Sequence, residues 1–156
     1  MSGRTYNITF RGVSVAAAQD LLSAYCGASM AIELVYVTLG QITQNNVEIL
    51  PISVELVPAT VTAGSGGNAF TPVPDAPTDV AATFTARIND TSQATSGGTI
   101  LHPHADAYNE VNGYQWIWPI GARIQAKPGE AIILSLDGAP AGARVMSGTM
   151  KIRELF

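Results

Sequence analysis

The sequence predicts an all-β protein: a single-domain, antiparallel, jelly-roll-like β-barrel or sandwich with one long loop. Several segments alternate apolar and polar residues with a period of two, the pattern of a strand that buries one face. Turn residues separate these segments, and no helical segments alternate with them as they would in a parallel sheet. The chain has 156 residues, which suits one core, so residues 1–156 are predicted to form one β domain.

The N-terminal quarter of the chain contains three candidate elements. Residues 5–11 alternate strictly and predict a half-buried strand. Residues 16–25 are rich in alanine and leucine, and their pattern leaves a short helix and a strand both open. Residues 31–39 are apolar on both faces apart from Glu33, so this strand is predicted to be covered on both sides.

The middle of the chain predicts two strands separated by a long loop. Residues 48–57 alternate, but Pro51 has no N–H to donate, so this strand is predicted to lie at an edge or to carry a bulge. Residues 58–79 are rich in glycine and proline and predict a long loop. Because long loops are uncommon in compact domains, this one is expected to reach across to another molecule. Residues 80–88 alternate again and predict a strand.

The C-terminal third predicts three more strands. They cover residues 114–119, 131–136 and 144–155, and the last of these is a long strand. Asn112 and the glycine after it favour a tight turn before the first of these strands, because both residue types tolerate positive φ.

Charge is the most informative part of the composition. Only 13% of the residues are charged, against about 25% in ordinary soluble domains. So neutral an exterior indicates that partner molecules cover part of it. The formal net charge of -4 and the scattered cations argue against nucleic-acid binding.

Cysteine content and hydropathy bear on the compartment. Cys26 is the only cysteine, so no internal disulfide can form. No stretch approaches the roughly 18 apolar residues that span a bilayer, and the N-terminus lacks the apolar core of a signal peptide. The chain is therefore expected to be synthesised in a cytoplasm and to have no membrane partner.

Two histidines with nearby acids form the most obvious candidate for chemistry. His102 and His104 are two residues apart and Glu110 follows, so a strand could present both imidazoles to one metal ion. This stretch resembles part of the first motif of the cupin family. Its glutamate, however, lies six residues after the second histidine, and no third histidine follows. A solvated or interface loop is the favoured interpretation, and a cupin-like metal-binding protein or small metal-dependent enzyme is the alternative.

The remaining candidates for catalysis are weaker. No Gly-x-Ser-x-Gly elbow is present to expose a serine, and Cys26 has no cationic neighbour in sequence that would lower its pKa. No enzymatic activity, catalytic residue or cofactor is therefore predicted. Trp116 and Trp118 share a strand face with Tyr114, which predicts core or subunit interface. A sugar-binding platform, in a carbohydrate-binding or tail-associated virion module, is the further alternative.

Seven short stretches, taken in order, resemble a family of small structural proteins encoded beside the major capsid protein of tailed bacteriophages. The resemblance covers nearly the whole chain and implies a jelly-roll-like β-barrel. In that family the Ala-Gln-Asp-Leu stretch is a strand, which favours strand over helix in residues 16–25. The stretches are Ala17-Ala-Gln-Asp20-Leu21, Leu39-Gly40-Gln41, Gly64-Ser-Gly-Gly67 with Thr71-Pro-Val-Pro74, Gly97-Gly-Thr-Ile-Leu-His102, Tyr114-Gln-Trp-Ile-Trp118, Lys127-Pro-Gly129 and Met146-Ser-Gly-Thr149.

The resemblance implies a virion component, a decoration or cement protein on the outside of an icosahedral head. The implied partners are the major capsid protein of a tailed phage and further copies of this chain, because cement proteins commonly form trimers. The implied role is to bridge capsomers and stabilise the shell, without covalent chemistry. The predicted contact residues are Arg4 near the N-terminus and Phe70, Pro72 and Pro74 in the long loop.

Overall fold

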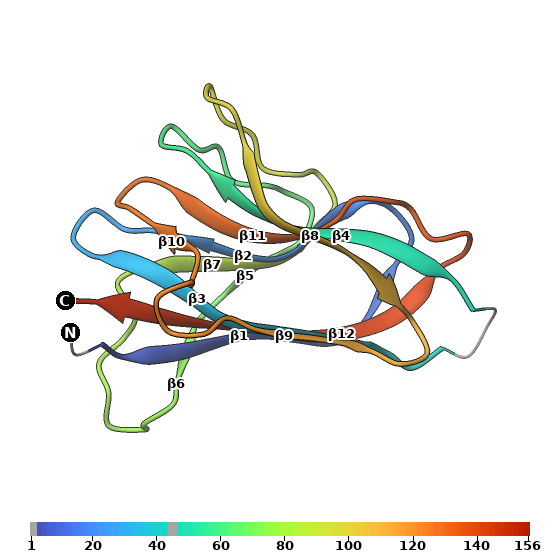
Figure 1. Ribbon diagram of the computed structural model, residues 1–156, viewed down its shortest axis with the longest axis horizontal. Coiled ribbons are helices and arrows are strands. Elements are labelled where there is room, and N and C mark those ends of the chain that lie inside the picture. The colour runs from blue at the N-terminus through green and yellow to red at the C-terminus, as the bar shows by residue number, and fades with distance from the viewer. Residues whose placement is uncertain (1–2, 44–46) are drawn as a thin grey trace.

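The computed structural model describes residues 3–43 and 47–156, and every regular element in them is a β-strand. Two antiparallel sheets pack face to face as a sandwich, without closing into a barrel (Figure 1). The strands are β1 (Thr5–Val15), β2 (Gln19–Tyr25), β3 (Ala31–Gln41), β4 (Ile49–Val57), β5 (Asn68–Phe70), β6 (Val73–Pro74), β7 (Thr85–Asp90), β8 (Leu101–Asn109), β9 (Tyr114–Ile117), β10 (Gln125–Ala126), β11 (Ala131–Leu136) and β12 (Arg144–Leu155).

The two sheets use strands that are far apart in the sequence. The first sheet, called sheet A, has the order β10-β3-β12-β1-β6, and β9 pairs with β3 beyond the end of β10. The second, sheet B, has the order β5-β7-β2-β11-β4-β8. The beginning of β1 and the end of β12 lie next to each other at one end of the sandwich (Figure 1). Strands β8 and β9 follow one another in the sequence but belong to different sheets, β8 to sheet B and β9 to sheet A.

Most of the predicted strands are confirmed. Strands β11 and β12 have the predicted bounds, and β1 begins at the predicted residue and continues to Val15. Residues 19–25 form strand β2, which confirms strand over helix for this segment. The strand predicted for residues 80–88 begins only at Thr85, because Phe84 and the residues before it leave the sheet.

The double-sided apolar pattern of residues 31–39 comes from a bulge. Strand β3 pairs with β12 through Leu34 and through Tyr36, and the register shifts between these pairs at Val35. Because an extra residue reverses the direction of every later side chain, apolar residues on both sides of the bulge point into the core. The prediction that both faces are covered is confirmed in part, since Glu33 on the outer face is buried, whereas Val35 and Tyr36 there are half-buried.

Pro51 occupies a position that the sequence did not predict. Strand β4 lies between β11 and β8, so it is not an edge strand, but its pairing with β8 does carry the predicted bulge, between Val54 and Leu56 and not at Pro51. Strand β11 ends at Leu136, opposite Ile52, and the Pro51 carbonyl accepts a hydrogen bond from the N–H of Asp137 at 2.9 Å. The missing N–H of the proline therefore faces the place where the neighbouring strand has already ended, so no ladder hydrogen bond is lost.

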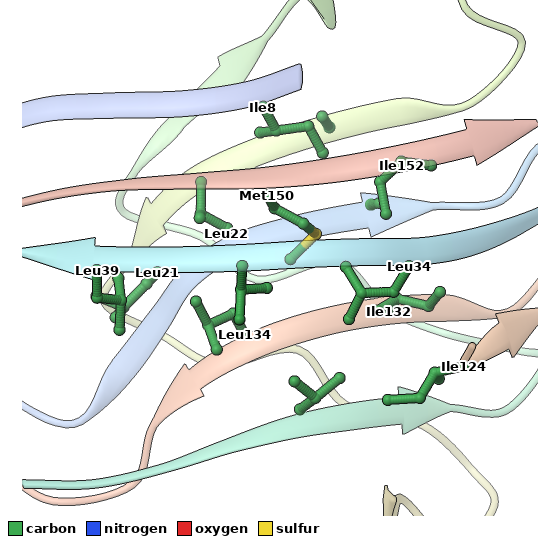
Figure 2. Packing of buried hydrophobic residues seen from close by; sticks show 14 of the residues in the cluster. Ile8, Leu21, Leu22, Leu34, Leu39, Ile124, Ile132, Leu134, Met150 and Ile152 are labelled. Atoms are coloured by element: carbon green, nitrogen blue, oxygen red, sulfur yellow. The ribbon is translucent and has the colours of Figure 1, made fainter. Parts of the chain in front are cut away.

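The core fills the space between the two sheets. Alternate residues of β3 and β12 in sheet A face alternate residues of β2 and β11 in sheet B (Figure 2). Burying each such aliphatic side chain stabilises the fold by about 1.5–3 kcal/mol. The residues labelled in Figure 2 are Ile8, Leu21, Leu22, Leu34, Leu39, Ile124, Ile132, Leu134, Met150 and Ile152.

The predicted long loop is bound to the domain along most of its length. Within residues 58–79, strand β5 joins the edge of sheet B and strand β6 joins the edge of sheet A. The preceding part, residues 58–67, pairs with residues 91–100 through isolated bridges, and together they form a flap over the outer face of sheet B (Figure 1). A second small apolar cluster holds this flap in place. The loop thus links the two sheets of its own chain.

Candidate functional site: the edge formed by strands β8 and β9

Strands β8 and β9 place two sheet edges on one side of the sandwich. Strand β8 pairs with β4, strand β9 pairs with β3, and residues 110–113 connect them. Within the described part of the chain neither strand has a second pairing partner. Their outer backbone N–H and C=O groups are therefore available to pair with another chain.

An aromatic cluster seals the gap between these edges. The ring of His104 on β8 lies 4.7 Å from that of Trp116 and 5.4 Å from that of Trp118, centroid to centroid. Burial, together with the charge of Asp106, raises the pKa of Tyr114 to about 12. The Tyr114 hydroxyl therefore stays protonated and can donate a hydrogen bond to His104 Nε2, at an oxygen–nitrogen distance of 2.6 Å. Side chains, and not backbone pairing, join the two sheets on this side.

The outer side of β9 and of the residues that follow it is apolar and uncharged. Trp116 is 42% exposed, Ile117 is 61% exposed and Ile120 is 84% exposed. Residues 111–122 contain no charged residue, although exposed edges usually carry charges that prevent association. Trp118 is only 7% exposed, so Trp116 alone presents a ring to solvent and the two tryptophans do not form a joint platform for a sugar.

The three candidate metal ligands lie apart. The pairing of β8 with β4 shifts register between Val54 and Leu56, and this bulge sends His102 and His104 to opposite faces of sheet B. His102 Nδ1 lies 3.3 Å from the Ser53 hydroxyl on the outer face, whereas His104 points inward. Across the described residues, no three His, Cys, Asp or Glu side chains gather closely enough to hold a metal ion.

Glu110 takes part in a buried ion pair. Arg144 Nε donates to the Glu110 carboxylate at 2.8 Å, and its Nη2 lies 3.2 Å from Glu48 Oε2. Both Glu110 and Arg144 are buried. These contacts join the β8–β9 turn to the beginning of β12 and to the segment before β4. Glu110 is thus committed to a structural contact, and its carboxylate is not directed at the histidines.

The predicted contact residues make contacts within their own chain. Arg4 lies 3.5 Å from Glu154 and stacks over the ring of Phe156 at 5.0 Å. Phe70 lies in β5 and packs against the core, and Pro74 pairs with β1 in β6. Pro72, between these two strands, is half-buried. That these four residues contact a partner stays a prediction.

The single cysteine is buried and weakly reactive. The Cys26 thiol donates to the carbonyl of Met30, with a sulfur–oxygen distance of 2.8 Å. Burial raises the pKa of the thiol, so little of the nucleophilic thiolate is present near neutral pH. This environment disfavours nucleophilic chemistry at Cys26.

Most of the few charges are neutralised inside the chain. Six of the eight cations lie within 4.0 Å of a carboxylate, and only Arg11 and Lys127 have no such partner in the described residues. Exposed ion pairs contribute little stability, but each one removes a free charge from the surface. The exterior is therefore even more neutral than the composition indicates.

A buried acid beneath the flap was not predicted from the sequence. Asp20 on β2 is 0% exposed and accepts a hydrogen bond from the N–H of Ala94 in the flap at 2.7 Å, while its Oδ1 has no partner. Burial, with the nearby charges of Glu55 and Asp90, raises the pKa of Asp20 to about 7. Asp90 is neutralised by Arg87 at 2.7 Å, but none of the ion pairs found in residues 3–43 and 47–156 involves Asp20.

Sequence reasoning also missed the exposure of Ile117 and Ile120. The alternation of residues 114–119 gives a strand but does not show whether that strand lies at an edge. The available signal was the absence of charged residues from 111–122. A segment without charge can be buried in its own chain or covered by a partner molecule, so this signal alone did not tell the two apart.

Comparison of the chain with known protein families, with curated proteins and with solved structures finds no match. No helix in residues 3–43 or 47–156 has the length and apolar character needed to span a membrane. The functional argument therefore rests on the surfaces and contacts described above.

Proposed function

We propose that the protein is a non-enzymatic structural component of a tailed-phage virion, a decoration protein that attaches as a homotrimer to the outside of the icosahedral head. The observation that supports this proposal best is the exposed, uncharged edge of β9 and of the residues that follow it, with Trp116, Ile117 and Ile120 at its surface. A monomer that exposed this edge permanently would be prone to association. Contacts with sister copies and with the capsid protein would cover it.

The proposed mechanism is bridging. A subunit that binds two neighbouring capsomers of the closed shell, but not their separated form, shifts the equilibrium towards closure by mass action. Trimers engage several sites at once, so a modest binding energy per copy gives a large combined effect. The sandwich suits this task because its two sheets share one hydrophobic core.

Binding to undecorated heads tests the proposal. Purified protein is mixed with heads that lack it; we expect bound trimers, measured by sedimentation and by sizing, and a higher temperature of shell opening. Failure of the wild-type protein to bind, or bound protein that leaves the opening temperature unchanged, would argue strongly against this function.

Two variants show whether the edge carries the contact. Ile117→Asp places a charge on the β9 edge, and we expect it to abolish trimer formation or head binding. Val80→Asp makes the same kind of change at another exposed apolar residue, outside the edge, and we expect it to behave as wild type. Equal behaviour of the two variants would show that the edge is not the contact surface.

A further inference from the structure

The flap separates the outer face of sheet B from water. It consists of residues 58–67, which run from β4 to β5, and residues 91–100, which run from β7 to β8. Isolated bridges join the two segments, and each segment is anchored to a strand at both ends. Neither segment contains a charged or titratable residue. The flap therefore covers the sheet without supplying a group that could neutralise a charge beneath it.

The face beneath the flap carries polar groups, and two of their atoms have no hydrogen-bond partner. Asp20 and Ser23, both on β2, are 0% and 1% exposed. Neither Asp20 Oδ1 nor Ser23 Oγ has a partner among the described residues. A buried polar atom without a partner destabilises the arrangement that buries it, because it has lost its hydrogen bonds to water. Both atoms would regain those bonds if the flap moved away.

Hydrogen bonds and a small apolar cluster hold the flap in place. The Ala94 N–H donates to Asp20 Oδ2 at 2.7 Å, and the Gly64 N–H donates to the Tyr25 hydroxyl at 3.3 Å. The apolar cluster under the flap is separate from the main core and much smaller. Because segments with few buried apolar contacts open at a lower free energy than a core, we expect the flap to open before the sandwich unfolds.

The titratable groups around Asp20 do not neutralise it. Arg87 forms two hydrogen bonds of 2.7 Å with Asp90, and none of the ion pairs among the described residues involves Asp20. Strand β11 and the flap contain no titratable residue. An ionised Asp20 is thus a buried negative charge with acidic neighbours. The surrounding groups are Tyr25 of β2, Glu55 of β4, Arg87 and Asp90 of β7 and, beyond Glu55, Asp137 and His102 of β8.

Two effects oppose each other when Asp20 ionises. Burial removes the water that would stabilise the charge, whereas the hydrogen bond from the Ala94 N–H becomes stronger when its acceptor is charged. Burial is the larger effect, because the pKa of Asp20 in the closed structure is raised to about 7. An open flap would admit water and return this pKa towards its ordinary value of 3.8. Closure is therefore favoured most below about pH 4 and becomes weaker as the pH rises to 7.

We propose that Asp20 is a pH-dependent switch for the flap: the protonated side chain keeps the flap closed over sheet B, and its ionisation lets the flap open locally while the rest of the sandwich stays folded. Opening gives Asp20 Oδ1 and Ser23 Oγ access to water. The switch operates within a single chain, so it does not depend on attachment to phage heads.

Amide hydrogen exchange of the wild-type protein, followed by nuclear magnetic resonance from pH 5 to pH 8 and corrected for the intrinsic exchange rate, tests the proposal. The reporters are the Thr62, Ala94 and Thr95 amides, whose hydrogen bonds hold the flap together or to Asp20, and the Ile132 amide in β11 reports global unfolding. We expect the flap to open far more often than Ile132 exchanges. Its opening constant should rise by about a hundredfold from pH 5 to pH 8, mostly below pH 7. Flap amides as protected as Ile132, or an opening constant that does not change with pH, would overturn the proposal.

Variants separate the charge of Asp20 from the other contacts of the flap. Asp20→Asn keeps the hydrogen-bond acceptor without the charge, and we expect it to remove most of the pH dependence of opening. Tyr25→Phe removes the acceptor for the Gly64 N–H, so it should raise the opening constant by about fivefold at every pH and keep the pH dependence. Asp106→Asn, at an exposed residue, is the matched control. Wild-type pH dependence in Asp20→Asn would refute the assignment, and the comparison with Ile132 decides the proposal by itself if that variant does not fold.

Discussion

Replacement of the buried acid Asp20 by asparagine is expected to stabilise the protein at and above neutral pH. The side chain would keep its size and its acceptor for the Ala94 N–H but would carry no charge. The folded-state pKa of about 7 lies above the ordinary aspartate pKa of 3.8, so the folded state binds more protons than the unfolded state between these values. The contribution of Asp20 to the free energy of unfolding is therefore greatest below about pH 4 and decreases as the pH rises towards 7.

The size of this effect follows from the pKa difference. A difference of about three units, at roughly 1.4 kcal/mol per unit, makes the wild-type charge destabilising by about 4 kcal/mol above pH 7. The new amide NH₂ group of asparagine would take the place of the unpartnered Oδ1. Because this buried NH₂ group would have no acceptor, it would destabilise the variant by roughly 1–3 kcal/mol. A net gain of about 1–3 kcal/mol is expected at pH 8, and a net loss of about 1–3 kcal/mol at pH 4, where the wild-type charge costs almost nothing.

Urea denaturation followed by tryptophan fluorescence, at intervals from pH 4 to pH 8, measures this difference. The variant-minus-wild-type value isolates Asp20 from Glu55, whose pKa burial also raises. Asp106→Asn is the control, because this exposed residue should change stability by less than about 0.5 kcal/mol at every pH. An Asp20→Asn protein that is no more stable than wild type at pH 8, with an unchanged pH profile, would refute the reasoning.

Three further predictions concern packing and exposure. Arg144→Met leaves the Glu110 carboxylate buried and unpaired, and is expected to lower the free energy of unfolding by about 3–5 kcal/mol in urea titrations; a double variant that also replaces Glu110 with Met should recover much of the loss. Gly148→Ala places a Cβ 2.8 Å from two buried side chains, so calorimetry should show a loss of about 1–3 kcal/mol, and a melting temperature equal to wild type would contradict the packing described. Acrylamide should quench one class of tryptophan strongly, and Trp116→Phe should remove it, leaving the shielded emission of Trp118; equal quenching before and after substitution would show that Trp118 is accessible.

Strand β8 shows why part of the candidate site could not be predicted. Residues 101–109 do alternate, but Pro103 lies among them and two of the apolar positions are alanines, so the local signal for a strand is weak. Strand formation there comes from pairing with β4, about fifty residues away in sequence, and a bulge in that pairing separates His102 from His104. Spacing alone placed these imidazoles on one face, because a regular strand has a period of two.

The buried polar groups were also beyond local reasoning. Asp20 and Asn89 are ordinary polar residues in the sequence, and only the flap and the neighbouring strands bury them. Their unusual properties, a raised pKa in the first and an unpartnered donor in the second, depend on what surrounds them. Burial of this kind is set by contacts between distant segments and has no signature in composition.

The amino-acid sequence by itself determined the strand content, the two-residue period of most strands and the scarcity of charge. These are local properties, because the alternation of a strand and the chemistry of its side chains need no distant partner. Tertiary structure decided which strands became edges, where bulges reversed a face and which polar groups lost contact with water. Those outcomes depend on register between strands far apart in the chain, and a shift of one residue exchanges the buried and exposed sides.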